Sequence, residues 1–254
     1  MSTQTPRVAL VTGASKGIGA EIVTRLRAQG FAVAAVARDV TALDALAERT
    51  GAQTFVADLT DASQIRSLLS AVQERMGSVD ILVNNAGIAE SAPLAQTDDA
   101  MVERTFAINV WPVFSLTRSL LPAMVSRGFG RVVNVASNAG LTGYAYTSAY
   151  CASKHAVVGF TRAIAAEIAR TGVTINAICP GFVDTEMTAR TVEKIVASTG
   201  RSHESARAAL EAMSPQRRLM TVQEVAHLVL ALVADEARGV HGQAIALDGG
   251  QVLA

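Results

Sequence analysis

The segment Val8–Gly19 reads VALVTGASKGIG and decides the fold. Its first five residues form an apolar run typical of a strand buried in a parallel sheet. Of the glycines that follow, Gly13 permits a tight turn, Gly17 lets backbone amides approach a pyrophosphate, and Gly19 allows close helix–strand packing. The helical stretch after them would point the positive end of its dipole at this anion. Three glycines alone are compatible with an ordinary turn, but the order of strand, turn and helix favours a dinucleotide-binding site.

The rest of the chain repeats short apolar runs separated by helical stretches. Such alternation requires crossover connections, which are right-handed and give a parallel sheet with helices on both faces. We therefore expect one doubly wound Rossmann-type α/β domain over residues 1–254, with a seven-stranded parallel sheet. The further strands are predicted at residues 31–37, 54–57, 79–83, 131–136, 174–179 and 243–247, and helices at about 18–29, 43–49 and 62–76.

Residues from about 183 to 214 do not follow this alternation of apolar runs and helical stretches. They are more polar and have a helical pattern. An insertion between the last two predicted strands would lie at the carboxyl edge of the sheet, where open α/β sheets bind ligands. We expect a small helical substrate lid, in which Met187 and Met213 would give a pliable apolar wall.

The composition excludes several classes of protein. Hydrophobic residues make up 50% of the 254 residues and charged residues 17%, so the chain can bury a large core. The 22 basic and 22 acidic residues balance, which argues against a nucleic-acid-binding protein. Cys151 and Cys179 make no disulfide framework and no metal site is indicated. Without a signal peptide or a membrane span in the sequence, we expect a cytoplasmic protein.

The end of the second predicted strand bears on the choice of dinucleotide. Asp39 lies about 20 residues beyond the glycines, where an acidic side chain would bind the ribose 2′-hydroxyl of NAD. Arg38 precedes it and Lys16 lies in the glycine-rich turn, and two cations there would favour the 2′-phosphate of NADP. Asp39 also suits the N-cap of the next helix. The sequence therefore favours NADP(H), with NAD(H) as the alternative.

Tyr150 and Lys154 stand four residues apart, a spacing that places them on one face of a helix. A free tyrosine has a pKa of about 10, too high for ready proton exchange at neutral pH. A neighbouring ammonium would stabilise the phenolate and lower that value, which would make the tyrosine a general acid or base. By itself the pair is a weak signal, since this spacing occurs by chance on many helices.

Taken together, the motifs make the chain resemble the short-chain dehydrogenase/reductase family from about Val8 to Gly250. Ser137 precedes Tyr150 by 13 positions, as in that family. The matching pieces, in family order, are Thr12-Gly-x-x-x-Gly-x-Gly19, Asp58-Leu-Thr60, Asn84-Asn-Ala-Gly87, Asn109, Ser137, Tyr150-x-x-x-Lys154 and Pro180-Gly181.

The resemblance implies a role for each of four catalytic residues. Tyr150 would exchange the substrate proton, and Ser137 would hydrogen-bond the substrate oxygen. Lys154 would bind the nicotinamide ribose and lower the Tyr150 pKa. Asn109 would hold a water that links Lys154 to a proton relay. Taken singly, Ser137 is equally compatible with a strand-end turn and Asn109 with a helix surface.

The resemblance also implies the cofactor contacts. Asp58 would meet the adenine edge, Asn84–Gly87 would line the cofactor, and Pro180 with its neighbours would hold the nicotinamide. The cofactor-binding residues expected on this basis are Gly13, Ser15, Lys16, Gly17, Ile18, Gly19, Arg38, Asp58, Leu59, Asn85, Ala86, Gly87, Tyr150, Lys154, Pro180, Gly181, Val183 and Thr185.

Within the family, residues 152–162, 169–183 and 247–250 resemble polyketide ketoreductases and 3-oxoacyl reductases. This implies a 3-oxoacyl thioester substrate on acyl carrier protein or coenzyme A, with a free secondary alcohol or ketone as the alternative. A dinucleotide sensor without catalysis is the remaining possibility. Arg127, Arg131 and Arg170 are candidates for contacting a carrier protein.

The resemblance further implies a homotetramer, formed through the helices that carry Asn109 and Tyr150 and through the last strand. The apolar residues Val157, Val158 and Phe160 suit such an interface but would equally suit a helix face packed on the sheet.

Overall fold

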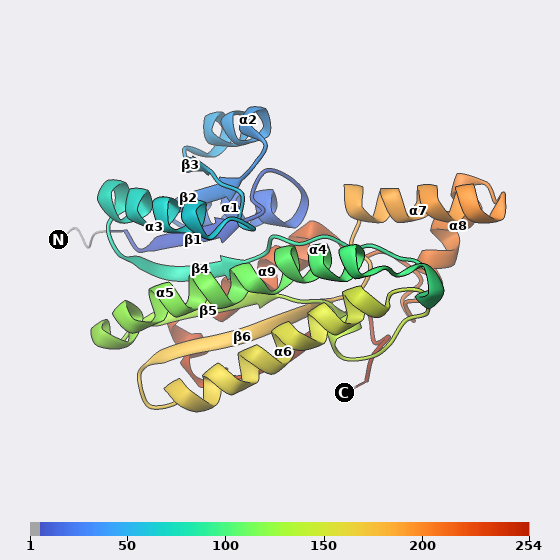
Figure 1. Cartoon of the computed structure of the whole chain (residues 1–254). Coiled ribbons are helices and arrows are strands. Elements are labelled where there is room, and N and C mark those ends of the chain that lie inside the picture. The colour runs from blue at the N-terminus through green and yellow to red at the C-terminus, as the bar shows by residue number, and fades with distance from the viewer. Residues whose placement is uncertain (1–5, 254) are drawn as a thin grey trace.

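One parallel sheet organises residues 6–253, the part of the chain that the computed structural model describes (Figure 1). Its strand order is β3-β2-β1-β4-β5-β6-β7. The two halves of the sheet run outward from β1 and β4, so the strand order reverses between them, and ligands of such sheets bind outside the carboxyl ends at this point. The strands are β1 (Val8–Thr12), β2 (Ala32–Ala37), β3 (Gln53–Val56), β4 (Val79–Asn84), β5 (Gly130–Val135), β6 (Val173–Pro180) and β7 (Ala244–Leu247).

Helices cover both faces of the sheet (Figure 1). One apolar cluster joins the strands to α3, α5 and α6, and a second joins them to α1, α2 and α9. Most residues of β1, β2, β4, β5 and β6 are buried, as their apolar runs require, whereas the edge strands β3 and β7 are partly exposed. The helices are α1 (Gly17–Ala28), α2 (Val40–Thr50), α3 (Ala62–Met76), α4 (Asp99–Asn109), α5 (Trp111–Arg127), α6 (Ser148–Ile168), α7 (Glu186–Thr199), α8 (His203–Glu211) and α9 (Val222–Val233).

The predicted fold class is confirmed: the seven strands of the described residues are all parallel and lie between two helical layers. Asp39 caps α2 by accepting a hydrogen bond from the amide of Ala42, as its predicted N-cap role requires. Among residues 6–253, no helix combines the length and the apolar character needed to cross a bilayer.

Residues 183–214, which we call the α7–α8 segment, leave the sheet after β6 and hold two helices at one end of the molecule (Figure 1). They have a small apolar cluster of their own, in which Val192 of α7 meets Ala206 and Leu210 of α8. A parallel bridge between Val183 and Met220 closes the base of the segment. This arrangement matches the helical insertion that the sequence predicts, and its role as a lid stays a prediction.

Candidate functional site

The glycine-rich turn after β1 is fastened to the end of β4. The hydroxyl of Thr12 accepts hydrogen bonds from the amides of Asn85 at 2.9 Å and Ala86 at 3.0 Å. The side-chain amide of Asn85 donates in return to the carbonyls of Thr12 at 2.9 Å and Gly13 at 3.2 Å. These bonds hold the two strand ends that flank the reversal of strand order at a fixed separation.

Two glycines in this turn leave no room for a side chain. Gly13 has φ 63°, and a Cβ on it would lie 2.9 Å from the Ala86 Cα atom. A Cβ on Gly19 would lie 2.2 Å from the Gly13 carbonyl oxygen. Beside this close-packed turn, α1 begins after Lys16 without a side-chain cap, so its first amides are available to an anion. The turn therefore fits the pyrophosphate of a dinucleotide.

The cations expected near the 2′ position make ion pairs within the protein. Lys16 binds Glu186, the first residue of α7, and Arg38 lies 3.7 Å from a carboxylate oxygen of Asp58. Asp58 also accepts hydrogen bonds from the amide and hydroxyl of Thr60, which lower the pKa of its carboxyl, with a smaller contribution from Arg38. The structure thus holds Asp58 as an anion at the end of β3.

The other residues expected at the dinucleotide lie along the carboxyl edge of the sheet. Ser15 and Ile18 flank Lys16 and Gly17 at the start of α1, and Leu59 packs beside the core. Thr185 approaches the turn, since a Cβ on Gly17 would lie 3.5 Å from its methyl group. Pro180 ends β6, Gly181 bonds to the Leu247 carbonyl at 3.1 Å, and the carbonyl of Val183 accepts a bond from Thr188.

Asn109, Ser137, Tyr150 and Lys154, which we call the tyrosine cluster, come from three elements and meet at this same edge. Ser137 follows β5, Tyr150 and Lys154 lie in the first turns of α6, and Asn109 ends α4. A Cβ on Gly87, after β4, would lie 3.2 Å from the Asn109 amide oxygen and 3.6 Å from the Lys154 ammonium. The glycine predicted to line the cofactor is therefore a neighbour of two of the predicted catalytic residues, Asn109 and Lys154.

The direction of the Tyr150 pKa shift differs from the one that the sequence predicts. Burial raises this pKa, and a hydrogen bond with the Ser137 side chain acts against it. Lys154 is not among the groups that shift it, and its Nζ lies 5.8 Å from the centre of the Tyr150 ring. Loss of solvent dominates the shift, and a lowering of the Tyr150 pKa by Lys154 stays a prediction. The phenol is held in its neutral, proton-bearing form.

Lys154 is itself buried, with 5% of its surface exposed. Its Nζ donates to the carbonyl of Val135 at 3.0 Å. Burial lowers the pKa of Lys154 to about 8. This ammonium releases its proton far more readily than an exposed lysine does.

Asn109 fixes the loop after β4 through both of its side-chain atoms. Its Oδ1 accepts from the amide of Ile88 at 2.8 Å, and its Nδ2 donates to the carbonyl of Ile88 and to the Ser153 hydroxyl, both at 3.0 Å. Ser153 donates in turn to the carbonyl of Tyr150 at 2.7 Å. Ser153 thus connects Asn109 to the first turn of α6, which carries Tyr150 and which we call the tyrosine turn. The sequence did not predict this role for Ser153.

Asp248 is a second residue that was missed. It is 3% exposed and accepts hydrogen bonds from the amides of Gly250, Gln251 and Val252, and from the side chain of Asn138. A Cβ on Gly181 would lie 2.9 Å from the Cβ of Asp248. The carboxylate therefore holds residues 250–252 next to Asn138, which follows Ser137. Gly181, which follows Pro180, packs against Asp248. The only signal in the sequence was its place in the Leu247–Gly250 motif.

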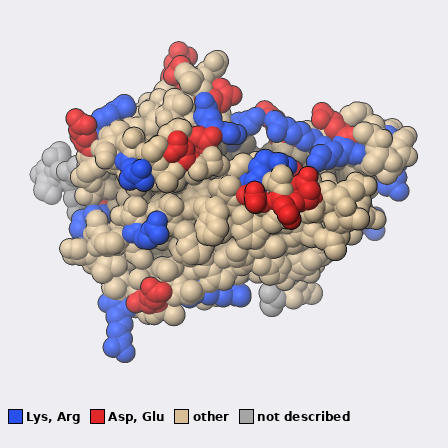
Figure 2. Space-filling model, viewed as in Figure 1, with Lys and Arg blue, Asp and Glu red and all other residues tan. Residues whose placement is uncertain are grey.

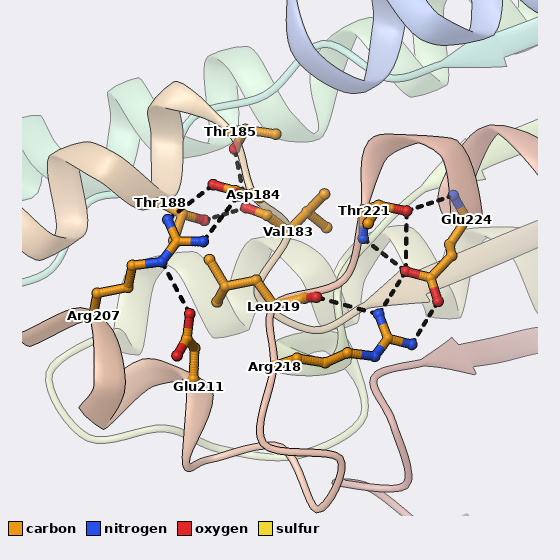
Figure 3. Close-up of polar contacts among 10 residues, drawn as sticks. All are labelled: Val183, Asp184, Thr185, Thr188, Arg207, Glu211, Arg218, Leu219, Thr221 and Glu224. Atoms are coloured by element: carbon orange, nitrogen blue, oxygen red, sulfur yellow. Dashed lines mark hydrogen bonds and ion pairs between the residues drawn. The ribbon is translucent and has the colours of Figure 1, made fainter. Parts of the chain in front are cut away.

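Ion pairs lie within the α7–α8 segment and just beyond its end, at the start of α9 (Figure 3). Arg207 of α8 binds both carboxylate oxygens of Asp184, at 3.1 and 2.9 Å, and also binds Glu211. Arg218 binds Glu224, which forms a capping box with Thr221 at the start of α9. Figure 3 shows the two arginines on either side of Leu219, each reaching an acidic residue of a neighbouring element.

The arginines suggested for carrier-protein contact lie at the wrong end of the sheet. Arg131 follows the first residue of β5 and is 3% exposed, Arg127 ends α5 just before that strand, and Arg170 lies before β6. Ser137 lies beyond the opposite end of β5, and at about 3.3 Å per residue the strand separates the two ends by roughly 20 Å. These three arginines therefore do not surround the tyrosine cluster.

The apolar residues considered for a subunit interface face the sheet. Val157, Val158 and Phe160 are at most 8% exposed and belong to the core cluster. Instead, α5 exposes Trp111 and Phe114, and the ring of Phe114 lies 4.2 Å from that of Phe160. α5 thus carries two exposed aromatic side chains.

The comparisons with known proteins agree with this geometry. Residues 7–196 match the family model described as short chain dehydrogenase. The chain is 38% identical to D-beta-hydroxybutyrate dehydrogenase of Cupriavidus necator, covering 97% of this chain and 98% of the relative. It is 33% identical to the 3-oxoacyl-[acyl-carrier-protein] reductase FabG of Escherichia coli, covering 97% and 98%.

A solved structure, a variant of actinorhodin polyketide ketoreductase with NADPH, superposes with a TM-score of 0.94 at 40% identity, covering 99% of both chains. The predicted family and enzyme class are confirmed, and the NADP(H) prediction agrees with the cofactor of this neighbour. The chain is an oxidoreductase and belongs to the short-chain dehydrogenase family.

Proposed function

We propose that this chain is an NADPH-dependent reductase that converts a 3-oxoacyl thioester, carried on acyl carrier protein or coenzyme A, into the 3-hydroxyacyl thioester. The observation that carries the proposal is the grouping of Asn109, Lys154 and the half-buried Tyr150 beside Gly87 at the carboxyl edge of the sheet, where desolvation raises the pKa of Tyr150 and keeps its phenol protonated. The similarity to a polyketide ketoreductase and to a 3-oxoacyl reductase supports this class of substrate.

When bound, the reduced nicotinamide supplies a hydride to the carbonyl carbon. Negative charge then develops on the carbonyl oxygen, and the hydroxyls of Ser137 and Tyr150 donate hydrogen bonds to it. The phenol transfers its proton to this oxygen, which gives the alcohol and leaves a phenolate on Tyr150. Because burial raises the pKa of Tyr150, the proton is present on the phenol at neutral pH.

After this transfer, Lys154 would pass a proton to the phenolate, and Asn109 would hold the surrounding groups in position. The ammonium lies near the tyrosine ring, and its lowered pKa, about 8, suits it to pass a proton on. Asn109 holds Ile88 and Ser153, and so fixes the positions of the loop after β4 and of the tyrosine turn. We propose that Lys154 also binds the nicotinamide ribose, since it lies next to Gly87.

NADPH is proposed over NADH because two cations, Lys16 and Arg38, lie at the ends of the first two strands, where the ribose 2′ substituent binds in this fold. Asp39 accepts a hydrogen bond as the N-cap of α2, which supports a structural role for it. The glycine-rich turn and the start of α1 would hold the pyrophosphate.

The second candidate is a dehydrogenase of a free secondary alcohol, favoured by the 38% identity to D-beta-hydroxybutyrate dehydrogenase. We further propose a homotetramer, with the exposed aromatic surface of α5 at a subunit contact. The lid role of the α7–α8 segment and a cytoplasmic location are also proposals. Each is separable from the chemistry of the tyrosine cluster.

The test is a panel of 3-oxoacyl thioesters, free ketones and secondary alcohols, followed by the change in NADPH and NADH absorbance. We expect fastest turnover with NADPH and a 3-oxoacyl thioester. Tyr150→Phe should lose turnover by about a thousandfold or more while NADPH binding is retained. Tyr146→Phe, at an exposed tyrosine, is the matched control. Binding of NADPH with no turnover on any substrate would support a sensor and overturn the proposal.

A further inference from the structure

The glycine-rich turn after β1 and the α7–α8 segment are joined by a salt bridge between Lys16 and Glu186. Lys16 precedes the first residue of α1, and Glu186 is the first residue of α7, 170 positions further along the chain. Arg190 lies 3.6 Å from the same Glu186 carboxylate, one helical turn along α7. The carboxylate of Glu186 therefore lies between two cations, Lys16 of the glycine-rich turn and Arg190 of α7.

Glu186 lies within electrostatic reach of the residues that follow β2, and the ribose 2′ substituent binds at the end of this strand in a Rossmann-type fold. The charge of Asp39, next to Arg38, is close enough to Glu186 to oppose the lowering of its pKa by Lys16 and Arg190. Thr185, its neighbour, faces Gly17 of the turn. Figure 2 shows basic atoms in a row between the α2 side and the α7–α8 side of this face.

We infer that Glu186 is a determinant of cofactor choice: its carboxylate competes with the ribose 2′-phosphate for Lys16 and weakens binding of 2′-phosphorylated dinucleotides relative to NAD(H). Two anions share one ammonium poorly, because a phosphate with about two negative charges and a carboxylate repel each other at contact distance. The inference rests on the proposed binding of NADP(H) at this turn.

The side chains of the pair are 52% and 61% exposed, so their attraction for each other is weak and the phosphate can displace Glu186. Removing the carboxylate leaves both Lys16 and Arg190 available to the phosphate. The effect should fall as salt is added, because screening acts on exposed charges. A ligand that has no 2′-phosphate should be almost indifferent to the change.

The experiment measures dissociation constants of NADP⁺, 2′,5′-ADP and NAD⁺ by calorimetry with the wild-type chain and with Glu186→Gln. We expect NADP⁺ and 2′,5′-ADP to bind roughly three- to tenfold more tightly to the variant, with NAD⁺ changed by less than about twofold. Glu193→Gln, at an exposed position on the same helix, is the control and should change none of the three.

A double-mutant cycle with Lys16→Met locates the effect. If competition for Lys16 is the cause, most of the tightening by Glu186→Gln disappears in the Lys16→Met background. Unchanged or weaker binding of NADP⁺ to Glu186→Gln, or an equal change for NAD⁺, overturns the inference. A wild-type chain that prefers NAD⁺ over NADP⁺ instead contradicts the proposed function, so the two failures are distinguishable.

Discussion

The tyrosine cluster and the α7–α8 segment lie at the same edge of the sheet but are held by opposite kinds of interaction. Asn109, Ser137 and Lys154 are at most 8% exposed, and their polar atoms bond to backbone groups or to buried side chains. Besides its small apolar cluster, the segment is held by exposed ion pairs, within it between Arg207 and Asp184 and to the glycine-rich turn between Glu186 and Lys16. Buried hydrogen bonds are costly to break, whereas exposed ion pairs contribute little and respond to salt.

This difference indicates that the tyrosine cluster and the α7–α8 segment have different roles. The reacting groups need fixed positions, and a densely bonded corner at the ends of β4, β5 and α4 provides them. A segment that would admit and release a substrate needs alternative positions of similar free energy, which weak surface pairs allow. Substitutions in the two regions should therefore differ in the size of their effects and in what they affect.

After the loss already predicted for Tyr150→Phe, the largest effect is expected for Ser137→Ala. This change removes the hydroxyl that opposes the rise of the Tyr150 pKa and one of the two donors proposed for the carbonyl oxygen. We expect kcat/KM to fall by roughly 10²- to 10³-fold, with little change in NADPH affinity. Steady-state kinetics and calorimetry of NADPH binding check this. Ser148→Ala, at the exposed start of α6, is the control, and an equal loss in both variants would contradict the assigned role.

A second prediction concerns Lys154 and the dependence of stability on pH. Because burial lowers its pKa from 10.5 to about 8, the unfolded chain binds more protons than the folded chain between these values. The free energy of unfolding contributed by this group therefore rises as the pH increases through the window, by about 3 kcal/mol in total.

Lys154→Met should lack that rise. Urea unfolding of the wild type and the variant on both sides of the window measures the difference, in which the contributions of other titrating groups cancel. A difference in stability that is independent of pH would show that Lys154 is not desolvated.

Local signals were sufficient for most of the fold. The helix expected at 62–76 has these bounds because Asp61 caps its start and Gly77, with φ 85°, ends it. The break after Asn109 is also local, since Pro112 lies in the first turn of α5 and has no amide to continue α4. Apolar runs identified every strand, because strands of a parallel sheet are buried on both faces.

The site was only partly predictable, because its remaining features depend on contacts between distant residues. Ser153 bonds to Asn109 across 44 positions, and no spacing rule connects them. The Tyr150 pKa moves up because of packing that spacing on one helix does not reveal. The pairing of Lys16 with Glu186 likewise depends on how the segment after β6 folds back over the first turn.

A third prediction tests whether Ser153 helps to hold the hydrogen-bonded region around the tyrosine cluster, which we call the rigid corner. Ser153→Ala leaves the Asn109 Nδ2 group with one acceptor fewer in a buried site, so we expect a loss of about 1–3 kcal/mol in the free energy of unfolding. The turnover number should fall more than the KM rises, because the tyrosine turn is displaced rather than the substrate contacts. Ser67→Ala, at an exposed position of α3, should leave both stability and turnover unchanged.

The smallest effect is expected for Arg207→Gln. It removes the pairs with Asp184 and Glu211, but these side chains are exposed, and we expect a stability loss of no more than about 1 kcal/mol at low salt and less at high salt. Arg201→Gln, on the connection between α7 and α8, is the control.

The informative measurement for Arg207→Gln is local. Hydrogen exchange in α7 and α8 should accelerate while exchange in α6 stays as in the wild type, because the anchor is lost without disturbing the buried corner. If α6 also exchanged faster, the two regions would be coupled, and the anchoring arginine would have to act on Tyr150 through β6. That result would replace the contrast between a rigid corner and an adjustable segment with a single cooperative unit.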